Sequence, residues 1–289
     1  MDRGALVAVV RGRVALIGGG YALQALAETL PQGSFVITSR SAETCGEFRA
    51  RGWLAAQLDL TDRASVASFA AAHPGLSAAV DSVPPLRGAP DPALGVRHLI
   101  EALEGTEISR IIYLSTTGVF GVRDGSWVSE STPAAPWHDQ GRARLRCEET
   151  YRAGRIPSCA FRLPAIYGPG RGLLQAIRAG TYSLIGSGAA FTNRIHVRDL
   201  AAALKKALSC EELPAVLCVA DDSPAPASEV AAFVCAQEGL PAPPSITEEE
   251  ALRRGAFTML SNQRISNAEM KRVLGLVLSY PSYREGFAR

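Results

Sequence analysis

The sequence lacks the features that mark membrane-spanning and nucleic-acid-binding proteins. The apolar run near the N-terminus, residues 5–10, is too short to cross a membrane or to form the apolar region of a signal peptide. The chain has no basic block and no acidic tail, and its net charge is only +2. We therefore expect a cytoplasmic protein that has neither a membrane nor a nucleic acid as its partner.

The spacing of the cysteines and the scarcity of lysine are also informative. The six cysteines include no Cys-x-x-C pair, and no histidine stands at a spacing suited to a shared metal ion. This pattern predicts reduced, mostly buried cysteines in a reducing compartment, and no metal site. Only three of the 30 basic residues are lysine, which we attribute to the base composition of the genome.

What the chain does contain is enough apolar sequence for a full core. Of its 289 residues, 47% are hydrophobic, so one or two domains are expected. Apolar runs alternate with segments of helical period, which predicts a Rossmann-type α/β fold with a doubly wound parallel sheet. The expected strands are residues 14–17, 34–38, 53–58, 78–83, 110–115, 159–163 and 215–219.

The regular alternation ends after residue 163, where glycine and proline become frequent. We expect a dinucleotide-binding core over 1–163, with 199–220 returning to the sheet, and a smaller substrate lobe over most of 164–289. Helices are predicted over 141–153, 199–209 and 228–238. A last helix should begin with a capping box formed by Ser266 and Glu269 and end at Gly275.

The segment 14–24, VALIGGGYALQ, is the strongest indication of a ligand. An apolar strand stops at three glycines and a helix begins at once, which is typical of a dinucleotide-binding turn. Gly18 would allow the sharp turn, and Gly20 would let a diphosphate approach the backbone. Tyr21 and Ala22 would begin the helix whose unpaired N–H groups face the phosphates. The third glycine of the motif is replaced by Leu23.

The end of the second strand bears on the choice of cofactor. An NAD site has an acidic residue there, whereas this chain has Ser39 and Arg40 and no carboxylate before Glu43. We therefore expect NADP as the cofactor, with Arg40 at its 2′-phosphate, and NAD as the alternative. Arg40 could instead be a solvated loop residue that binds no cofactor. Asp59 and Leu60 follow the third strand and would face the adenine, although Asp59 could instead cap a helix beginning near Thr61.

Five segments in order resemble the extended short-chain dehydrogenase/reductases, also called the NAD-dependent epimerase/dehydratase family. The resemblance covers nearly the whole chain. It rests on the glycine motif, YLSTTGVFG at 113–121, FRLPAIYGPG at 161–170, NRIHVRD at 193–199, and the closing segment from RISN at 264–267 to YPSYRE at 280–285.

The resemblance implies a role for each matching residue. Thr116 matches the catalytic Ser/Thr that hydrogen-bonds a substrate oxygen. The resemblance also implies a small-molecule substrate and a possible homodimer through the fourth and fifth helices. The cofactor would contact Val83, Pro84, Ser115, Leu163, Pro164 and Ala165, and the substrate pocket would include Phe120, Asn193, Arg194 and His196.

The chain departs from the family at its catalytic pair. The family has a tyrosine and a lysine four residues apart on one helix face, where the lysine charge lowers the tyrosine pKa. Here Gln140 and Arg144 hold these positions. Glutamine cannot act as a general acid near neutral pH, but Arg144 could still bind the nicotinamide ribose.

Other residues could replace the tyrosine. Tyr167 is the best candidate, with a packed loop aromatic as the alternative, whereas Tyr151 is expected to be structural. His138 could reach the pocket from its rim unless it is simply solvated, and His196 could equally be a satisfied structural histidine. Arg194 could anchor an anionic substrate or form an ordinary ion pair.

Three functions remain open. The first is an NADP-dependent oxidoreductase acting on a small carbonyl or alcohol, in which Thr116 polarises the oxygen and the proton comes from water, Tyr167 or the substrate. The second is a catalytically degenerate dinucleotide sensor or partner-binding protein, which the Gln140/Arg144 pair favours. The third is a lyase or isomerase that reuses the pocket, with Leu23 as the sign of a remodelled phosphate turn.

Overall fold

The computed structural model describes residues 12–287, and these form two compact units that alternate along the chain. The first comprises residues up to 115, 143–161 and 201–217, and the second comprises 116–142, 162–200 and 218–287. The segment 116–142, which the sequence analysis placed in the core, therefore clusters with the second unit. The apolar run at residues 5–10 lies outside the described residues.

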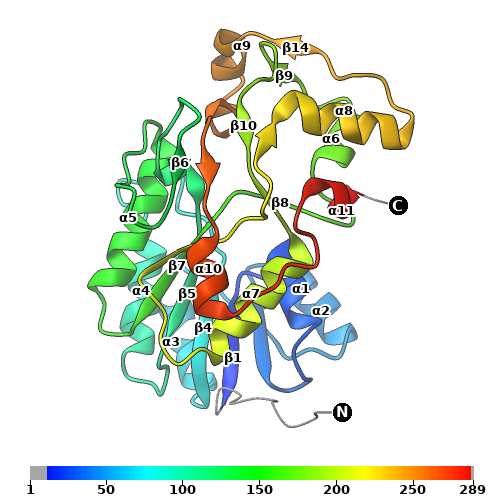
Figure 1. Cartoon of the computed structure of the whole chain (residues 1–289). Coiled ribbons are helices and arrows are strands. Elements are labelled where there is room, and N and C mark those ends of the chain that lie inside the picture. The colour runs from blue at the N-terminus through cyan, green and yellow to red at the C-terminus, as the bar shows by residue number, and fades with distance from the viewer. Residues whose placement is uncertain (1–11, 288–289) are drawn as a thin grey trace. The chain divides into compact units, whose positions relative to one another are not determined.

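A seven-stranded parallel sheet in the order β12-β7-β5-β4-β1-β2-β3 is the framework of the first unit, as the sequence predicted (Figure 1). All seven expected strands are present, because a strand buried on both faces reads as a continuous apolar run. The strands are β1 (Arg13–Ile17), β2 (Phe35–Ser39), β3 (Ala55–Gln57), β4 (Leu76–Asp81), β5 (Ile111–Thr116), β7 (Ser158–Leu163) and β12 (Val216–Cys218).

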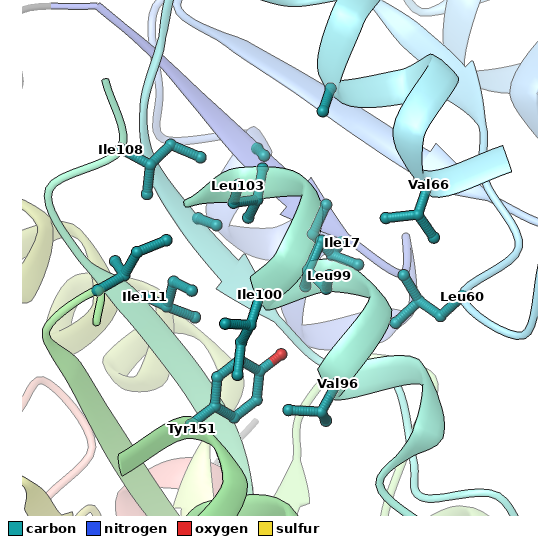
Figure 2. Close-up of a cluster of buried hydrophobic side chains, with 14 of the residues drawn as sticks. Ile17, Leu60, Val66, Val96, Leu99, Ile100, Leu103, Ile108, Ile111 and Tyr151 are labelled. Atoms are coloured by element: carbon teal, nitrogen blue, oxygen red, sulfur yellow. The ribbon is translucent and has the colours of Figure 1, made fainter. Parts of the chain in front are cut away.

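Helices cover both faces of this sheet. On one face, α3, α4 and α5 bury a shared apolar cluster, in which Val66, Leu99 and Tyr151 come from the three helices in turn (Figure 2). On the other face, Lys205 of α7 donates a hydrogen bond to the Thr29 carbonyl just beyond α1. The helices are α1 (Tyr21–Ala27), α2 (Ala42–Ala50), α3 (Arg63–Ala72), α4 (Leu94–Leu103), α5 (Asp139–Ala153) and α7 (Val197–Ser209).

The second unit is built from short strands paired two by two and from short helices. Parallel β8 and β11 pair Tyr167 with His196, and antiparallel β10 and β13 pair Thr192 with Ala225. Its strands are β6 (Trp127–Val128), β8 (Ala165–Tyr167), β9 (Leu184–Ile185), β10 (Phe191–Thr192), β11 (Arg194–His196), β13 (Ala225–Pro226), β14 (Ser245–Ile246) and β15 (Arg264–Ile265). Its helices are α6 (Leu173–Arg178), α8 (Ala227–Glu238), α9 (Glu248–Arg253), α10 (Ala268–Leu274) and α11 (Tyr283–Phe287), with 3-10 turns at Thr117–Val119 and Phe257–Leu260.

Two predicted caps are wrong. The last predicted helix, α10, begins at Ala268 with Asn267 as its N-cap and no side-chain hydrogen bond, so Ser266 and Glu269 form no capping box. Gly275 does end this helix, at φ +55°. Helix α3 is capped by Asp62, whose side chain accepts from the Ala64 N–H, and not by Asp59.

Three further findings concern absences within the described part of the chain. Residues 12–287 contain no helix that is both long and apolar enough to cross a membrane. In the same range, no group of three His, Cys, Asp or Glu side chains is placed to hold a metal ion. The six cysteines all lie in this range and form no disulfide.

Candidate functional site

The glycine turn after β1 is held in place by the neighbouring strand β2. The N–H of Gly18 donates to Thr38 Oγ1 at 3.0 Å, and the N–H of Gly19 donates to the Thr38 carbonyl at 2.6 Å. Gly18 has φ +84°, and a Cβ there would lie 2.9 Å from Val83 Cγ2. Only glycine therefore fits at position 18 without strain.

The space above this turn is open. A Cβ on Gly20 would meet no described atom within 4 Å, whereas one on Gly19 would lie 2.5 Å from Phe48. The Leu23 side chain is wholly buried in the core, so it does not fill the turn. The turn therefore fits a diphosphate, which would approach Gly20 and the first amides of α1, including that of Ala22.

Polar residues gather where β2 and β3 end. Arg40 is exposed, and the Ser39 hydroxyl accepts from the Ser41 N–H at 3.1 Å. Asp59 accepts from both the N–H and the hydroxyl of Thr61, and these bonds hold its pKa below the usual value, with the charge of Arg40 contributing. Ser39, Arg40 and Asp59 thus belong to one edge of the first unit.

Gln140 and Arg144 lie one turn apart on α5. Gln140 is exposed, whereas the half-buried Arg144 donates through Nη1 to the Leu114 carbonyl and to Tyr113 Oη, both at 2.9 Å. Arg144 therefore fastens α5 to the end of β5. The Ser115 hydroxyl is also engaged, because it donates to Glu148 at 2.5 Å.

A buried carboxyl that sequence reasoning missed lies at the end of β4. Asp81 accepts from Tyr151 Oη at 2.6 Å and from the Val83 N–H at 2.8 Å. Burial raises the pKa of Asp81 to about 6, despite both hydrogen bonds. Tyr151 is 2% exposed and has the structural role proposed for it. The only signal in the sequence was an acidic residue closing an apolar strand directly before Val83.

The second unit contains a pocket of about 400 Å³. Thr116, the last residue of β5, contributes to its wall, as do Asn193 and Arg194. Pro164 and Ala165 also line it. The other lining residues are Thr117, Gly118, Leu173, Tyr182, Ile185, Gly188, Ala190, Phe191, Thr192, Ala227, Val230, Thr258, Met259, Ser261 and Gln263.

Arg194 is the charged residue of this wall, and it is 5% exposed. Its guanidinium donates to the carbonyls of Thr192 and Ser223 and, at 2.6 Å, to Thr192 Oγ1. Burial lowers its pKa, which the charge of Asp221 opposes. Burial in turn raises the pKa of Asp221 to about 7.

Several residues predicted to contact substrate are engaged with the protein instead. Asn193 donates to the Gln263 carbonyl and accepts from the Ile265 N–H, both at 2.8 Å. His196 stacks on Tyr280 with ring centroids 3.7 Å apart. The two hydrogen bonds of Asn193 therefore hold the pocket wall in place.

Tyr167 and Phe120 are absent from the pocket wall as far as residues 12–287 define it. Tyr167 is buried, its Oη donates to the Ser282 carbonyl at 3.3 Å, and burial raises its pKa further. Tyr167 is therefore a packed aromatic residue, which was the alternative to a role as proton donor. Phe120 belongs to an apolar cluster with Val128 and Ile265.

His138 is neither solvated nor on the rim, because it is 4% exposed. It caps α5: its Nδ1 accepts from the Gly141 N–H at 3.0 Å, and its carbonyl accepts from the Arg142 N–H. Burial, with the charge of Arg142, lowers its pKa, so the ring is neutral at pH 7. Nε2 is buried and has no hydrogen-bond partner among the described residues.

Gln263 is a pocket residue that sequence reasoning missed. Its Nε2 donates to the Thr117 carbonyl at 3.0 Å, while its Oε1 is buried without a partner in the range 12–287. A lone glutamine between a 3-10 turn and a two-residue strand carries no sequence signal.

Comparisons with known proteins agree with this geometry. The chain is similar to a solved protein of unknown function from Silicibacter pomeroyi, with 31% identity, 96% of each chain covered and a TM-score of 0.78. It shares its fold with the human epimerase family protein SDR39U1, solved with NADPH, at 20% identity, a TM-score of 0.75 and coverage of 95% of this chain and 97% of that one. It also shares its fold with UDP-glucuronic acid 4-epimerase from Bacillus cereus, solved with NAD, at 15% identity and a TM-score of 0.75. That match covers 95% of this chain and 94% of the epimerase chain.

A search of curated proteins gave no match. The model of the NAD-dependent epimerase/dehydratase family matches residues 14–216, which is most of the chain. With the glycine turn, the parallel sheet and Thr116 at the end of β5 all in place, the chain belongs to this family of extended short-chain dehydrogenase/reductases.

Proposed function

We propose that this protein is an NADP-dependent oxidoreductase that acts on the carbonyl or alcohol carbon of a small metabolite. The observation that carries the proposal is the turn at Gly18–Gly20, which Thr38 holds in shape and which Leu23 leaves open. A turn remodelled by leucine was the argument for a lyase or isomerase, and the burial of Leu23 removes that argument.

The preference for NADP rests on Arg40. Its exposed guanidinium follows β2 directly, where a 2′-phosphate would bind, and no carboxylate occurs before Glu43. The similar solved structures include one with NADPH and one with NAD, which supports a nicotinamide dinucleotide and favours neither form.

Thr116 and Arg194 would act on the substrate. The bound nicotinamide would supply or accept the hydride. On reduction, the carbonyl carbon gains the hydride, the π-bond electrons move to the oxygen, and the oxygen takes a proton from water or the substrate. The Thr116 hydroxyl would donate to that oxygen, and Arg194 would attract a carboxylate or another anionic group.

Arg144 would keep positive charge at the position where the family has lysine. Its Nη1 is fixed by the Leu114 carbonyl and Tyr113, which leaves Nη2 for the nicotinamide ribose. Gln140 supplies no proton, so a slow enzyme is expected, since a general acid contributes roughly 10²–10⁴ in rate.

The same Gln140 favours a second candidate, a dinucleotide sensor that binds the cofactor without turnover. Binding of NADPH together with turnover of a ketone supports the enzyme. Tight binding with no turnover across a broad panel of aldehydes and ketones supports the sensor.

The Arg40→Glu variant tests the cofactor assignment. Titration of nucleotide by fluorescence should show NADPH affinity reduced by about 10–100-fold, the loss of a charge-assisted phosphate contact. NADH affinity should change far less. Equal losses for the two nucleotides would contradict the NADP preference, and no nucleotide binding by the wild type would overturn the proposed function.

We also infer a cytoplasmic, reducing location. Five of the six cysteines are buried, and no pair forms a disulfide.

A further inference from the structure

His138 presents an unused hydrogen-bond donor. Because the Gly141 N–H donates to Nδ1 at 3.0 Å, Nδ1 carries no proton, and the neutral ring carries its proton on Nε2. A buried donor that no described residue accepts from destabilises the folded state, because it has lost its hydrogen bond to water. Such a group in a native protein calls for an acceptor beyond the described residues, such as a water molecule or a bound ligand.

The Thr116 hydroxyl lies near the same point. Thr116 Oγ1 and His138 Nε2 are each 3.5 Å from the position that a Cβ on Gly118 would occupy. Thr116 Oγ1 accepts from the Gly118 N–H at 3.2 Å, which leaves its own hydrogen to donate elsewhere. Thr116 and Gly118 both line the pocket, and glycine has no side chain to separate a ligand from the two donors.

We propose that His138 Nε2–H and the Thr116 hydroxyl together bind the reacting oxygen of the substrate beside Gly118. This pair would stand in for the phenol that Gln140 cannot provide, and the inference rests on the proposed function. Two fixed donors in a buried site stabilise the negative charge that develops on the oxygen during hydride transfer. A neutral imidazole serves this purpose as a donor and need not be charged.

Two substitutions of the same residue separate this role from helix capping. His138→Asn retains an oxygen that can accept from the Gly141 N–H, since asparagine is a good N-cap, but it removes the donor at Nε2. His138→Gln retains a donor at the far end of the side chain and loses the cap. A third variant, Gly118→Ala, fits at ordinary contact distances of 3.5–3.6 Å and places a methyl group 3.5 Å from both donors.

The assay is NADPH oxidation with a panel of small keto acids led by 4-oxopentanoate, which combines a ketone for Thr116 with a carboxylate for Arg194. His138→Asn and Gly118→Ala should each lower kcat by about 10²–10³, the effect of losing one oxyanion donor, with an unchanged Tm. His138→Gln should retain most of kcat and have a lower Tm. A His138→Asn variant with wild-type kcat would overturn the proposal.

A crystal structure of the wild-type protein decides the matter even if no ketone is reduced. The expected result is one oxygen atom, from water or ligand, within hydrogen-bonding distance of both His138 Nε2 and Thr116 Oγ1. The absence of such a shared oxygen would overturn the proposal that His138 and Thr116 bind one oxygen together. If NADPH fails to bind but the shared oxygen is present, the proposed function fails while the oxygen site stands.

Discussion

At the scale of single residues, Gly18 and Gly20 have separable roles. Gly18→Ala places a side chain at φ +84° and 2.9 Å from Val83, so the free energy of unfolding should fall by about 1–3 kcal/mol. Gly20→Ala, at φ −77° with open space around it, should leave that free energy unchanged and weaken NADPH binding at least ~10-fold. Urea unfolding and NADPH titration measure the two effects. Equal destabilisation by both substitutions would contradict this division.

Asn193 offers a second test at this scale. Its side-chain amide links the Gln263 carbonyl and the Ile265 N–H, so Asn193→Ala leaves two backbone groups without partners. The free energy of unfolding should fall by about 1–3 kcal/mol. The dissociation constant for NADPH should not change. Unchanged stability of the variant would contradict this structural role of Asn193.

The residues show where sequence reasoning reaches its limit. Gly18 was identified because a tight turn constrains residue type locally, and Thr116 because of the family resemblance. Asn193 was assigned to the substrate pocket by the same resemblance, and Tyr167 because its loop was expected to border the nicotinamide pocket. Their actual partners, Gln263 and Ser282, lie 70 and 115 positions away in the chain, and no local pattern predicts such pairs.

At the scale of elements, the long parallel strands were predictable, and the short ones were not. An apolar run such as 111–116 is buried on both faces of the sheet and stands out against its surroundings. Strands of two or three residues, such as β8 and β10, are too short to show a period. Most of the candidate pocket lies on loops, 3-10 turns and such short strands, which give a weaker sequence signal than the glycine turn.

The contact between β4 and α5 predicts a dependence of stability on pH. Burial raises the pKa of Asp81 to about 6 in the folded protein, above its ordinary 3.8, so the folded state binds this proton more tightly. Its contribution to stability is therefore complete below about pH 4 and lost as the pH rises through 6, a change of about 3 kcal/mol. Asp81→Asn removes this titration.

Urea unfolding of the wild type and Asp81→Asn at pH 4, 5.5 and 7 measures this effect. The wild type should lose stability relative to the variant as the pH rises. Asparagine can still accept from the Val83 N–H, and its amide can donate to Tyr151, so both hydrogen bonds remain possible at each pH. Parallel stability curves for the two proteins would contradict the raised pKa.

At the scale of the whole molecule, nucleotide binding should be visible as stability. A ligand that binds only the folded state at 100 times its dissociation constant adds about 2.7 kcal/mol. NADPH should therefore raise the Tm of the wild type, and Gly20→Ala should reduce the increase at the same NADPH concentration, since tenfold weaker binding leaves only about 1.4 kcal/mol of stabilisation. The variant's own Tm without nucleotide is the control. An equal increase for both proteins would place the nucleotide away from the glycine turn.

Assembly is a further prediction at this scale. A homodimer through α4 and α5 would bring together exposed faces of these two helices. The faces carry ion pairs within each chain, among them Arg63–Glu101 and Arg146–Glu149. Among residues 12–287, α4 and α5 expose no large apolar side chain. Such a dimer should dissociate as salt rises from 0.05 to 1 M, because exposed charges are screened, the Debye length falling to about 3 Å at 1 M. Sedimentation velocity across this range measures the effect. A dimer that persists at high salt would need a different, apolar interface.

Thr38 lies in β2 and Arg40 directly follows this strand, yet only Thr38 shapes the glycine turn. Thr38 fixes the backbone of Gly18 and Gly19 through its hydroxyl and carbonyl, whereas Arg40 extends into solvent. An engineer who wishes to exchange one nucleotide for the other can therefore vary positions 39 and 40 freely. The threonine beside them must be left alone, since replacing it would alter how either nucleotide is held.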